Sequence, residues 1–174
     1  MNKSSKTVYE GKALTLKLEQ VAYPDGSRGS LEIIRHPGGA ATVALNERGE
    51  VCLIRQYRYA TNGWLWEIPA GRIDYNEDPF ETAQRELGEE AGIIANQWDT
   101  LTTIFPSPGI CDERIYLYMA TDLTPISTSH EEDEHIEIHW IPFAEAIKWI
   151  QQGEIIDAKT IIALFCAQYT ISAN

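Results

Sequence analysis

The stretch between Gly71 and Ile93 constrains this chain most, because it contains a helix with both ends marked in the sequence. Asp78 is placed to cap the helix and Pro79 to occupy its first position. Glu81 completes a capping box with Asp78, and Gly92 supplies the stop. We therefore predict one short, well-defined helix that ends just before Gly92.

An arginine and three glutamates crowd the last part of this helix: Arg85, Glu86, Glu89 and Glu90. Glu86 and Glu90 are four residues apart and face each other, which costs roughly 0.2–0.5 kcal/mol for an exposed pair. The helix dipole also disfavours anions near this end. An apolar stripe is predicted beside the acids, and it consists of Phe80, Ala83, Leu87 and Ala91. Either the acids form an ordinary solvated face, or a divalent cation with oxygen ligands offsets their repulsion.

The N-terminal part, residues 1–36, is predicted to form strands. Alternating leucines at 14–18 indicate a half-buried strand, the turn sequence Tyr23–Gly26 follows, and residues 30–35 return as the second arm of a hairpin. His36-Pro37-Gly38-Gly39 then breaks the pattern. Two or three strands are marginal alone, so this extension is expected to pack on the main body, residues 37–174, or on a second subunit.

The main body alternates strands and helices. Strands are predicted at about 41–45, 51–54, 64–68, 100–105, 114–120 and 136–140, with helices at 142–151 and 157–169 after the acidic helix. The expected buried faces of these last two helices are Ala144, Ile147 and Ile150, then Ile161, Ile162 and Phe165. This order predicts an α/β fold of mixed sheets with helices on both faces.

Composition excludes several classes of protein. A net charge of −12 argues against a nucleic-acid partner, because phosphate backbones need clustered Lys and Arg. No apolar run approaches the roughly 20 residues of a membrane-spanning helix, and the N-terminus lacks the apolar core of a secretory signal. Three widely spaced cysteines form neither a disulfide framework nor a zinc motif, so we expect a cytoplasmic protein. The four histidines are scattered and do not favour a zinc site.

Gly71, Glu77 and the run from Arg85 to Ile93 occupy every defined position of a fixed 23-residue frame, which resembles the Nudix box of the Nudix hydrolases. The resemblance implies an α/β/α sandwich and a Mg²⁺-dependent pyrophosphohydrolase, with Mn²⁺ as a possible substitute. It implies metal ligation by Glu86, Glu90 and the backbone carbonyl of Ala70, with Glu89 as a further metal ligand or a catalytic acid. It assigns structural roles to four residues of the box: Gly71, Glu77, Arg85 and Gly92.

Further motifs are similar to the ADP-ribose pyrophosphatase branch: Arg35–Gly38, Arg55-Gln56-Tyr57-Arg58, Trp66–Gly71 and Ser107-Pro108-Gly109. Pro108 stands about 15 residues past the box, where that branch has its marker. By this resemblance we expect substrate contacts from Arg55, Arg58, Trp66, Pro108 and Glu113. The alternatives for these residues are ordinary ion pairs, packing and a simple turn.

The acidic loop 130–135 corresponds to the loop from which that branch takes its general base. Counting back from Ile136 assigns the base to Glu132 and a metal-linked acid to Glu134, within about two residues, whereas a solvated loop is the plain alternative. The resemblance implies a homodimer whose N-terminal strands help to form the substrate pocket, and hydrolysis of ADP-ribose. Other nucleotide sugars, such as GDP-mannose or ADP-glucose, and a silent nucleotide-binding module stay as alternatives.

Overall fold

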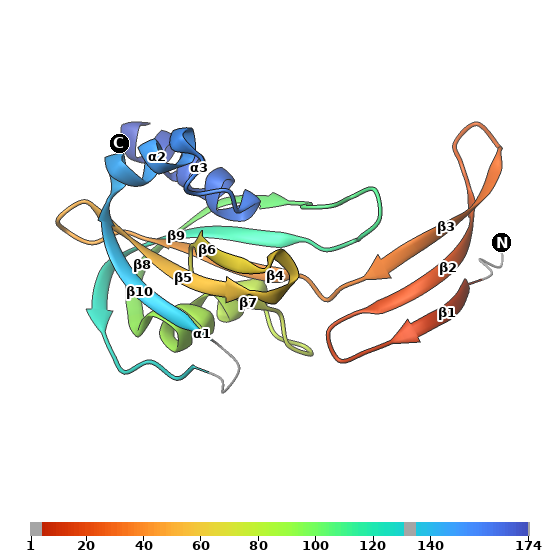
Figure 1. Cartoon of the computed structure of the whole chain (residues 1–174), viewed down its shortest axis with the longest axis horizontal. Helices are drawn as coiled ribbons and strands as arrows, with labels where there is room; N and C mark the ends of the chain where they lie inside the picture. The colour runs from red at the N-terminus through yellow and green to blue at the C-terminus, as the bar shows by residue number, and fades with distance from the viewer. Residues whose placement is uncertain (1–4, 131–134, 174) are drawn as a thin grey trace.

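The computed structural model describes residues 5–130 and 135–173, which form a layered α/β body with a β extension at its N-terminal end (Figure 1). The extension is an antiparallel sheet of β1 (Ser5–Glu10), β2 (Thr15–Ala22) and β3 (Arg28–Arg35). It projects from one side of the body, and β4 begins at Gly39. The chain therefore passes from the extension to the body through residues 36–38.

Within the described part of the body, seven strands form two sheets. One sheet has the order β10-β5-β6, with β10 (Ile136–Pro142), β5 (Glu50–Arg58) and β6 (Gly63–Glu67). The other has the order β7-β4-β9-β8, with β7 (Ala70–Arg72), β4 (Gly39–Ala44), β9 (Ile115–Pro125) and β8 (Ile93–Ile104). β4 runs parallel to β9 and antiparallel to β7, so this sheet is mixed as expected.

Helices cover the two sides of the sheets. The acidic helix α1 (Pro79–Ala91) lies on one side, whereas α2 (Phe143–Gln152) and α3 (Ala158–Ala173) lie on the other (Figure 1). Alternate side chains of a strand point to opposite faces. Accordingly, Val51 and Leu53 of β5 join the core under α2 and α3, whereas Cys52 packs with Leu87 of α1. The α/β/α expectation is confirmed, and no helix in the described ranges is long and apolar enough to cross a membrane.

The acidic helix has the ends that the sequence predicts. The Asp78 side chain accepts a hydrogen bond from the Phe80 backbone, and a capping box with Glu81 is present. Gly92 adopts a left-handed conformation with φ 64° and ends the helix. Three residues of the predicted apolar stripe, Ala83, Leu87 and Ala91, are buried, while Phe80 packs against Trp98 and Tyr118.

The predicted buried faces of the last two helices are partly wrong. In α3 the buried residues are Thr160, Ala163, Leu164 and Ala167, whereas Ile162 and Phe165 are exposed. In α2, Ile147 is buried as expected, but Ala146 is buried where Ala144 was predicted. α3 is apolar on nearly all sides, so hydrophobicity alone does not identify which side meets the sheet. The short strand β7 was not predicted.

Candidate active site

Three glutamates of α1 line one cavity of about 310 Å³ together with β5 and β7. Its walls include Glu86, Glu89 and Glu90 from the helix, Ala70 and Gly71 from β7, and Gln56 and Arg58 from β5. The Glu90 side chain is 2% exposed and accepts a hydrogen bond of 2.7 Å from the Ala70 backbone N–H. This contact fixes the end of the helix against β7, so that the carbonyl of Ala70 and the carboxylates border one space.

Gly71 allows the close approach between β7 and the helix. A Cβ atom at this position would overlap the Glu86 carboxylate and would lie 2.5 Å from its Oε2. The predicted structural role of Gly71 therefore has a physical basis, since only hydrogen leaves room for this carboxylate. The backbone of Gly71 and the carboxyl group of Glu86 are thus in direct van der Waals contact.

Arg85 organises the acids around it. Its Nε and Nη2 donate hydrogen bonds of 2.9 and 3.0 Å to the two oxygens of Glu77. Its Nη1 donates to Glu86 Oε1 at 2.6 Å and to Glu89 Oε2 at 3.0 Å. The hydrogen bonds from Arg85, with those from the Asp74 backbone and Thr82, hold the pKa of Glu77 at about 2. The same contacts raise the pKa of Arg85 above its usual value, so this guanidinium stays charged.

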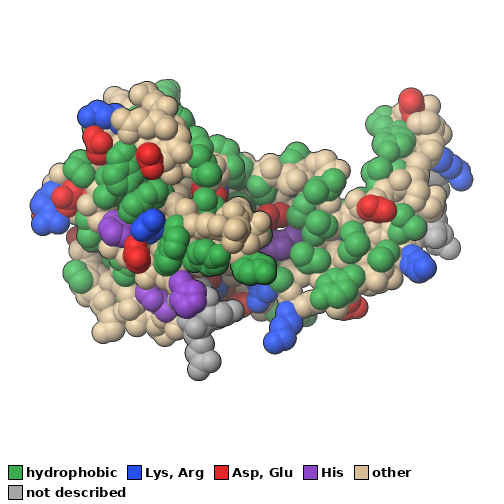
Figure 2. Space-filling model, viewed as in Figure 1, with side chains coloured by type: hydrophobic (Ala, Val, Ile, Leu, Met, Phe, Trp, Pro, Cys, Tyr) green, Lys and Arg blue, Asp and Glu red, His purple; other side chains and the backbone are tan. Residues whose placement is uncertain are grey.

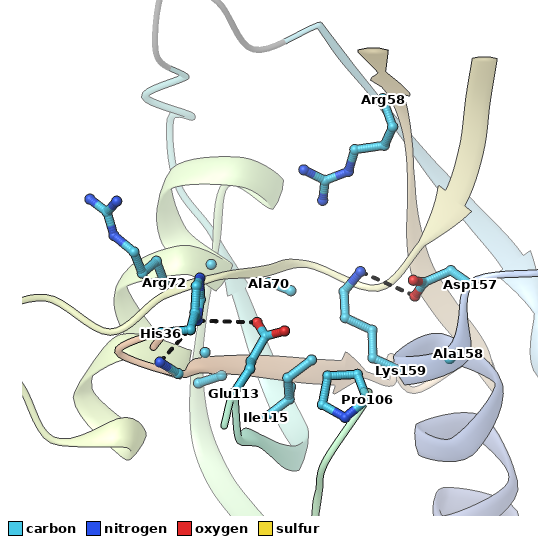
Figure 3. A pocket seen from close by; sticks show the side chains of 14 residues that line it. His36, Arg58, Ala70, Arg72, Pro106, Glu113, Ile115, Asp157, Ala158 and Lys159 are labelled. Atoms are coloured by element: carbon cyan, nitrogen blue, oxygen red, sulfur yellow. Dashed lines mark hydrogen bonds and ion pairs between the residues drawn. The ribbon is translucent and has the colours of Figure 1, made fainter. Parts of the chain in front are cut away.

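A second cavity, of about 380 Å³, adjoins the first and has Arg58, Ala70, Gly71 and Arg72 in common with it. Figure 3 shows His36 and Glu113 on one side of it and Lys159 with Asp157 on the other. His36 Nδ1 lies 3.4 Å from Glu113 Oε1. Together the two cavities have an acidic end at α1 and an end of mixed charge near α3, within the size range of small-molecule sites.

A buried glutamate and its two cationic partners hold the shared wall of the cavities in place. Glu67, which is 1% exposed, accepts hydrogen bonds of 2.8 and 2.7 Å from Arg58 and a further one from Lys159. Burial alone raises the pKa of Glu67, but the hydrogen bonds and charges of Arg58 and Lys159 outweigh burial and leave that pKa below its usual value. Arg58 is therefore a fixed cation at the junction of the two cavities.

The start of α3 is tied to the same wall. Asp157 Oδ2 accepts hydrogen bonds from the Thr160 backbone at 3.0 Å and from the Thr160 hydroxyl at 2.6 Å. Thr160 Oγ1 in turn accepts from the Ile68 backbone N–H at 3.0 Å. Because Ile68 lies two residues before Ala70, α3 braces the segment that presents the Ala70 carbonyl.

The other predicted substrate residues, Arg55, Trp66 and Pro108, do not line either of the two cavities. Arg55 lies on the opposite face of β5 from Arg58, with its guanidinium 5.4 Å from the Trp64 ring and 5.8 Å from the Trp66 ring. Trp66 packs against Trp149 of α2. Pro108 lines a different hollow beside β3. Substrate contact by Arg55, Trp66 and Pro108 stays a prediction.

Two predicted acids, Glu132 and Glu134, lie outside the described residues. The residues on either side of them are placed. The Ser129 backbone donates to Glu89 O at 3.0 Å, and His130 Nε2 lies 2.8 Å from Glu90 O. On the other side, the Tyr57 backbone donates to His135 O at 3.2 Å. The described residues that precede and follow these acids therefore contact the end of α1 and β5, respectively.

Comparison with known proteins identifies the family. The NUDIX domain matches residues 35–164. The chain belongs to the Nudix family. It is 34% identical over 159 residues to "ADP-ribose pyrophosphatase" of Bacillus subtilis, covering 90% of this chain and 86% of that protein. It is 35% identical over 165 residues to "GDP-mannose pyrophosphatase" of Cronobacter sakazakii, covering 84% and 85%. A solved structure, "Crystal structure of ADP compounds hydrolase", matches its fold with a TM-score of 0.84 and 24% identity over 98% of this chain and 92% of that one.

The matched Nudix domain includes the acidic helix, so this protein is a Nudix pyrophosphohydrolase, as the sequence predicts. Nudix hydrolases use divalent metal ions, and the residues of this cavity fit such an ion. Carboxylate and carbonyl oxygens suit a hard cation, and Gly71 lets Glu86 approach β7. The buried Oε1 of Gln56 accepts no hydrogen bond from any residue that the structure describes.

The side chains do not close a metal site by themselves. Within residues 5–130 and 135–173, no group of three acidic, His or Cys side chains converges as metal ligands do. The physical reason lies in Arg85 and Ala70, which hold oxygens of Glu86, Glu89 and Glu90 by hydrogen bonds. A cation at this site would compete with these donors for the carboxylates, so its binding would require local movement of the side chains.

Several residues of the second cavity were not predicted from the sequence. Arg72, Lys159 and Asp157 line it together with His36, for which the sequence predicted a strand break and a branch motif but no substrate contact. Lys159 is 92 residues from Glu67, its buried partner, and no motif relates the two. The Asp157–Thr160 spacing typical of a helix cap was the one available signal.

Proposed function

We propose that this protein hydrolyses the diphosphate linkage of ADP-ribose, giving AMP and ribose 5-phosphate, with Mg²⁺ as its cofactor and Mn²⁺ as a substitute. The observation that carries the proposal is the pair of adjoining cavities, in which three glutamates occupy one end and Arg58 stands at the junction. A nucleoside diphosphate sugar needs both features, namely a place for the diphosphate and space beside it for the sugar.

The metal would be held by Glu86, Glu90 and the carbonyl of Ala70, with Glu89 as a further ligand. When bound, it neutralises charge that develops on the diphosphate and lowers the pKa of bound water. Arg85 and Glu77 keep the glutamates oriented through their paired hydrogen bonds. We assign the general base to Glu132 and a supporting acid role to Glu134 and Glu89. His130 and Ser129 fix one side of the loop to the helix.

Besides the glutamates, the substrate would contact a cationic side chain, Arg58. Arg58 stands at the junction of the two cavities, and its Nε and Nη2 are held by Glu67. Glu113 faces His36 in the second cavity, where a carboxylate can accept hydrogen bonds from sugar hydroxyls (Figure 3). Arg55, Trp66 and Pro108 stay in the proposal as groups that contact substrate outside these cavities.

A substrate panel tests the proposal. The value of kcat/KM is measured for ADP-ribose, GDP-mannose and ADP-glucose at one fixed Mg²⁺ concentration, with products identified by chromatography. We expect ADP-ribose to be preferred at least tenfold, with AMP and ribose 5-phosphate in equal amounts. Preference for GDP-mannose, the activity in the name of the relative from Cronobacter sakazakii, would establish the alternative substrate. Failure to hydrolyse any of the three would refute the proposal.

We also propose that residues 1–36 form a dimerisation element of a cytoplasmic homodimer. Hydrophobic side chains are exposed on the extension, and they include Val8, Tyr9, Leu18, Tyr23 and Leu31. Figure 2 shows hydrophobic side chains spread over this side of the extension and a hollow where it meets the body. In a dimer the partner subunit would cover this surface of the extension, and the extension would border the partner's substrate pocket. Sedimentation at micromolar concentration gives the mass, and a fully active monomer would contradict the assignment.

A further inference from the structure

Gln56 lies on the β5 face that turns towards the acidic helix. It shares this face with Cys52, which packs with Leu87 of that helix. The Gln56 side chain lines the cavity that also contains the three glutamates of α1. It is 6% exposed, which is unusual for a glutamine. A polar residue in this position needs a polar partner.

The side-chain carbonyl of Gln56 has no such partner in the part of the chain that the structure describes. Its Oε1 is buried and accepts no hydrogen bond. Within the described residues, the hydrogen bonds of the cavity-wall cations go to other acceptors: Arg58 donates to Glu67, Arg72 to Lys12 O, and Arg85 to Glu77, Glu86 and Glu89. A buried acceptor without a donor is unfavourable and is uncommon in native proteins. Because Gln56 lines the cavity, a donor that enters with a ligand is the candidate partner for this oxygen.

We propose that Gln56 is a positioning residue of the divalent-cation site, and that its Oε1 accepts a hydrogen bond from a water molecule bound to the cation. The inference rests on the proposed metal-dependent function. Mg²⁺ keeps several of its waters when proteins bind it, and each such water is a strong hydrogen-bond donor. Gln56 belongs to a different element from the carboxylates, so it holds the water from the β5 side of the cavity.

The neutrality of glutamine suits this task. Three carboxylates already line the cavity, and burial together with the charge of Glu90 raises the pKa of the Cys52 thiol to about 12. A fourth acid at position 56 would add repulsion before the cation binds. An apolar side chain of the same length would remove the acceptor. Glutamine supplies an oxygen without adding charge.

Two substitutions at this position test the inference. Gln56→Met keeps length and removes the amide, whereas Gln56→Glu keeps an acceptor oxygen. Mn²⁺ binding is measured by isothermal titration calorimetry without substrate, and the Tm is measured in EDTA. We expect Gln56→Met to bind Mn²⁺ about tenfold more weakly, as is common for groups that support metal ligands. Its Tm in EDTA should equal or exceed that of the parent protein, because an unsatisfied buried acceptor has been removed.

Gln56→Glu should restore Mn²⁺ affinity at least to the parent value while lowering the Tm in EDTA. This pattern separates positioning of the cation from a structural role, which would lower Tm in Gln56→Met as well. Gln97→Met on β8 makes the same chemical change at an exposed site outside the cavity and should bind Mn²⁺ like the parent. Unchanged Mn²⁺ affinity in Gln56→Met, or a lower Tm in EDTA, would overturn the inference. Absence of Mn²⁺ binding by the parent protein would instead refute the proposed function.

Discussion

Gly71→Ala is expected to damage catalysis while leaving the fold intact. The new Cβ would lie 2.5 Å from Glu86 Oε2 and closer to the other two carboxyl atoms, whereas ordinary contacts begin at 3.4 Å. The carboxylate must therefore move by about 1 Å or more, away from its hydrogen bond with Arg85. A displacement of about 1 Å in a catalytic arrangement can reduce the rate about 100-fold. We expect kcat/KM for ADP-ribose to fall by about that factor.

Stability should change little in the same variant. The clash is with a flexible side chain, and alanine is intrinsically more favourable than glycine within a strand by about 0.5–1 kcal/mol. The free energy of unfolding in urea should thus stay within about 1 kcal/mol of the parent value. Gly63→Ala is the matched control, because a Cβ there has only Thr61 O as a neighbour, at 3.9 Å. If Gly71→Ala keeps the parent kcat/KM and Mg²⁺ dependence, the close approach of Glu86 to β7 has no catalytic importance.

Two further predictions concern the residues around the site. The pKa of Glu77 is lowered to about 2, so its ion pair with Arg85 stabilises the fold above about pH 4.5 and is lost as pH falls towards 2. After allowance for solvent screening, the parent should lose about 2 kcal/mol more unfolding free energy than Glu77→Gln between pH 6 and pH 2.5 in urea titrations; equal losses would contradict this. Thr160→Val leaves the Ile68 N–H without its acceptor and should cost about 1–3 kcal/mol. The same variant should reduce kcat/KM through Ala70, while Thr160→Ser should retain both properties; a Thr160→Val protein with parent stability would show that α3 does not brace this wall.

Local signals in the sequence were sufficient to predict the helix that carries the acids. Asp78 and Glu81 form the predicted capping box, and Gly92 ends the helix in the left-handed conformation. These interactions depend on residues a few positions apart, so spacing alone reveals them. Hydrophobic patterns also predicted most strands of the body, because strand residues that face the core are apolar.

Long-range contacts were beyond the reach of sequence patterns. The buried Glu67 pairs with Arg58 and Lys159, and the three residues come from three elements whose packing no local pattern encodes. The buried side of α3 was wrongly predicted for a related reason. Ile162 and Phe165 are as apolar as Leu164, so only tertiary packing decides which residue meets the sheet. Gln56 stood within a recognised motif, but its burial without a donor became visible only in the fold.

The central claim is that the glutamates of α1 carry out metal-dependent hydrolysis of a diphosphate. The most direct test is the turnover of ADP-ribose by Glu90→Gln, monitored by ³¹P NMR at increasing Mg²⁺ concentrations. The amide keeps the shape of Glu90 and an oxygen that can accept from the Ala70 N–H, so circular dichroism should show an intact fold. We predict a loss of at least about 100-fold in kcat that added Mg²⁺ does not restore. A folded variant that converts ADP-ribose to AMP and ribose 5-phosphate at the parent rate would contradict the account.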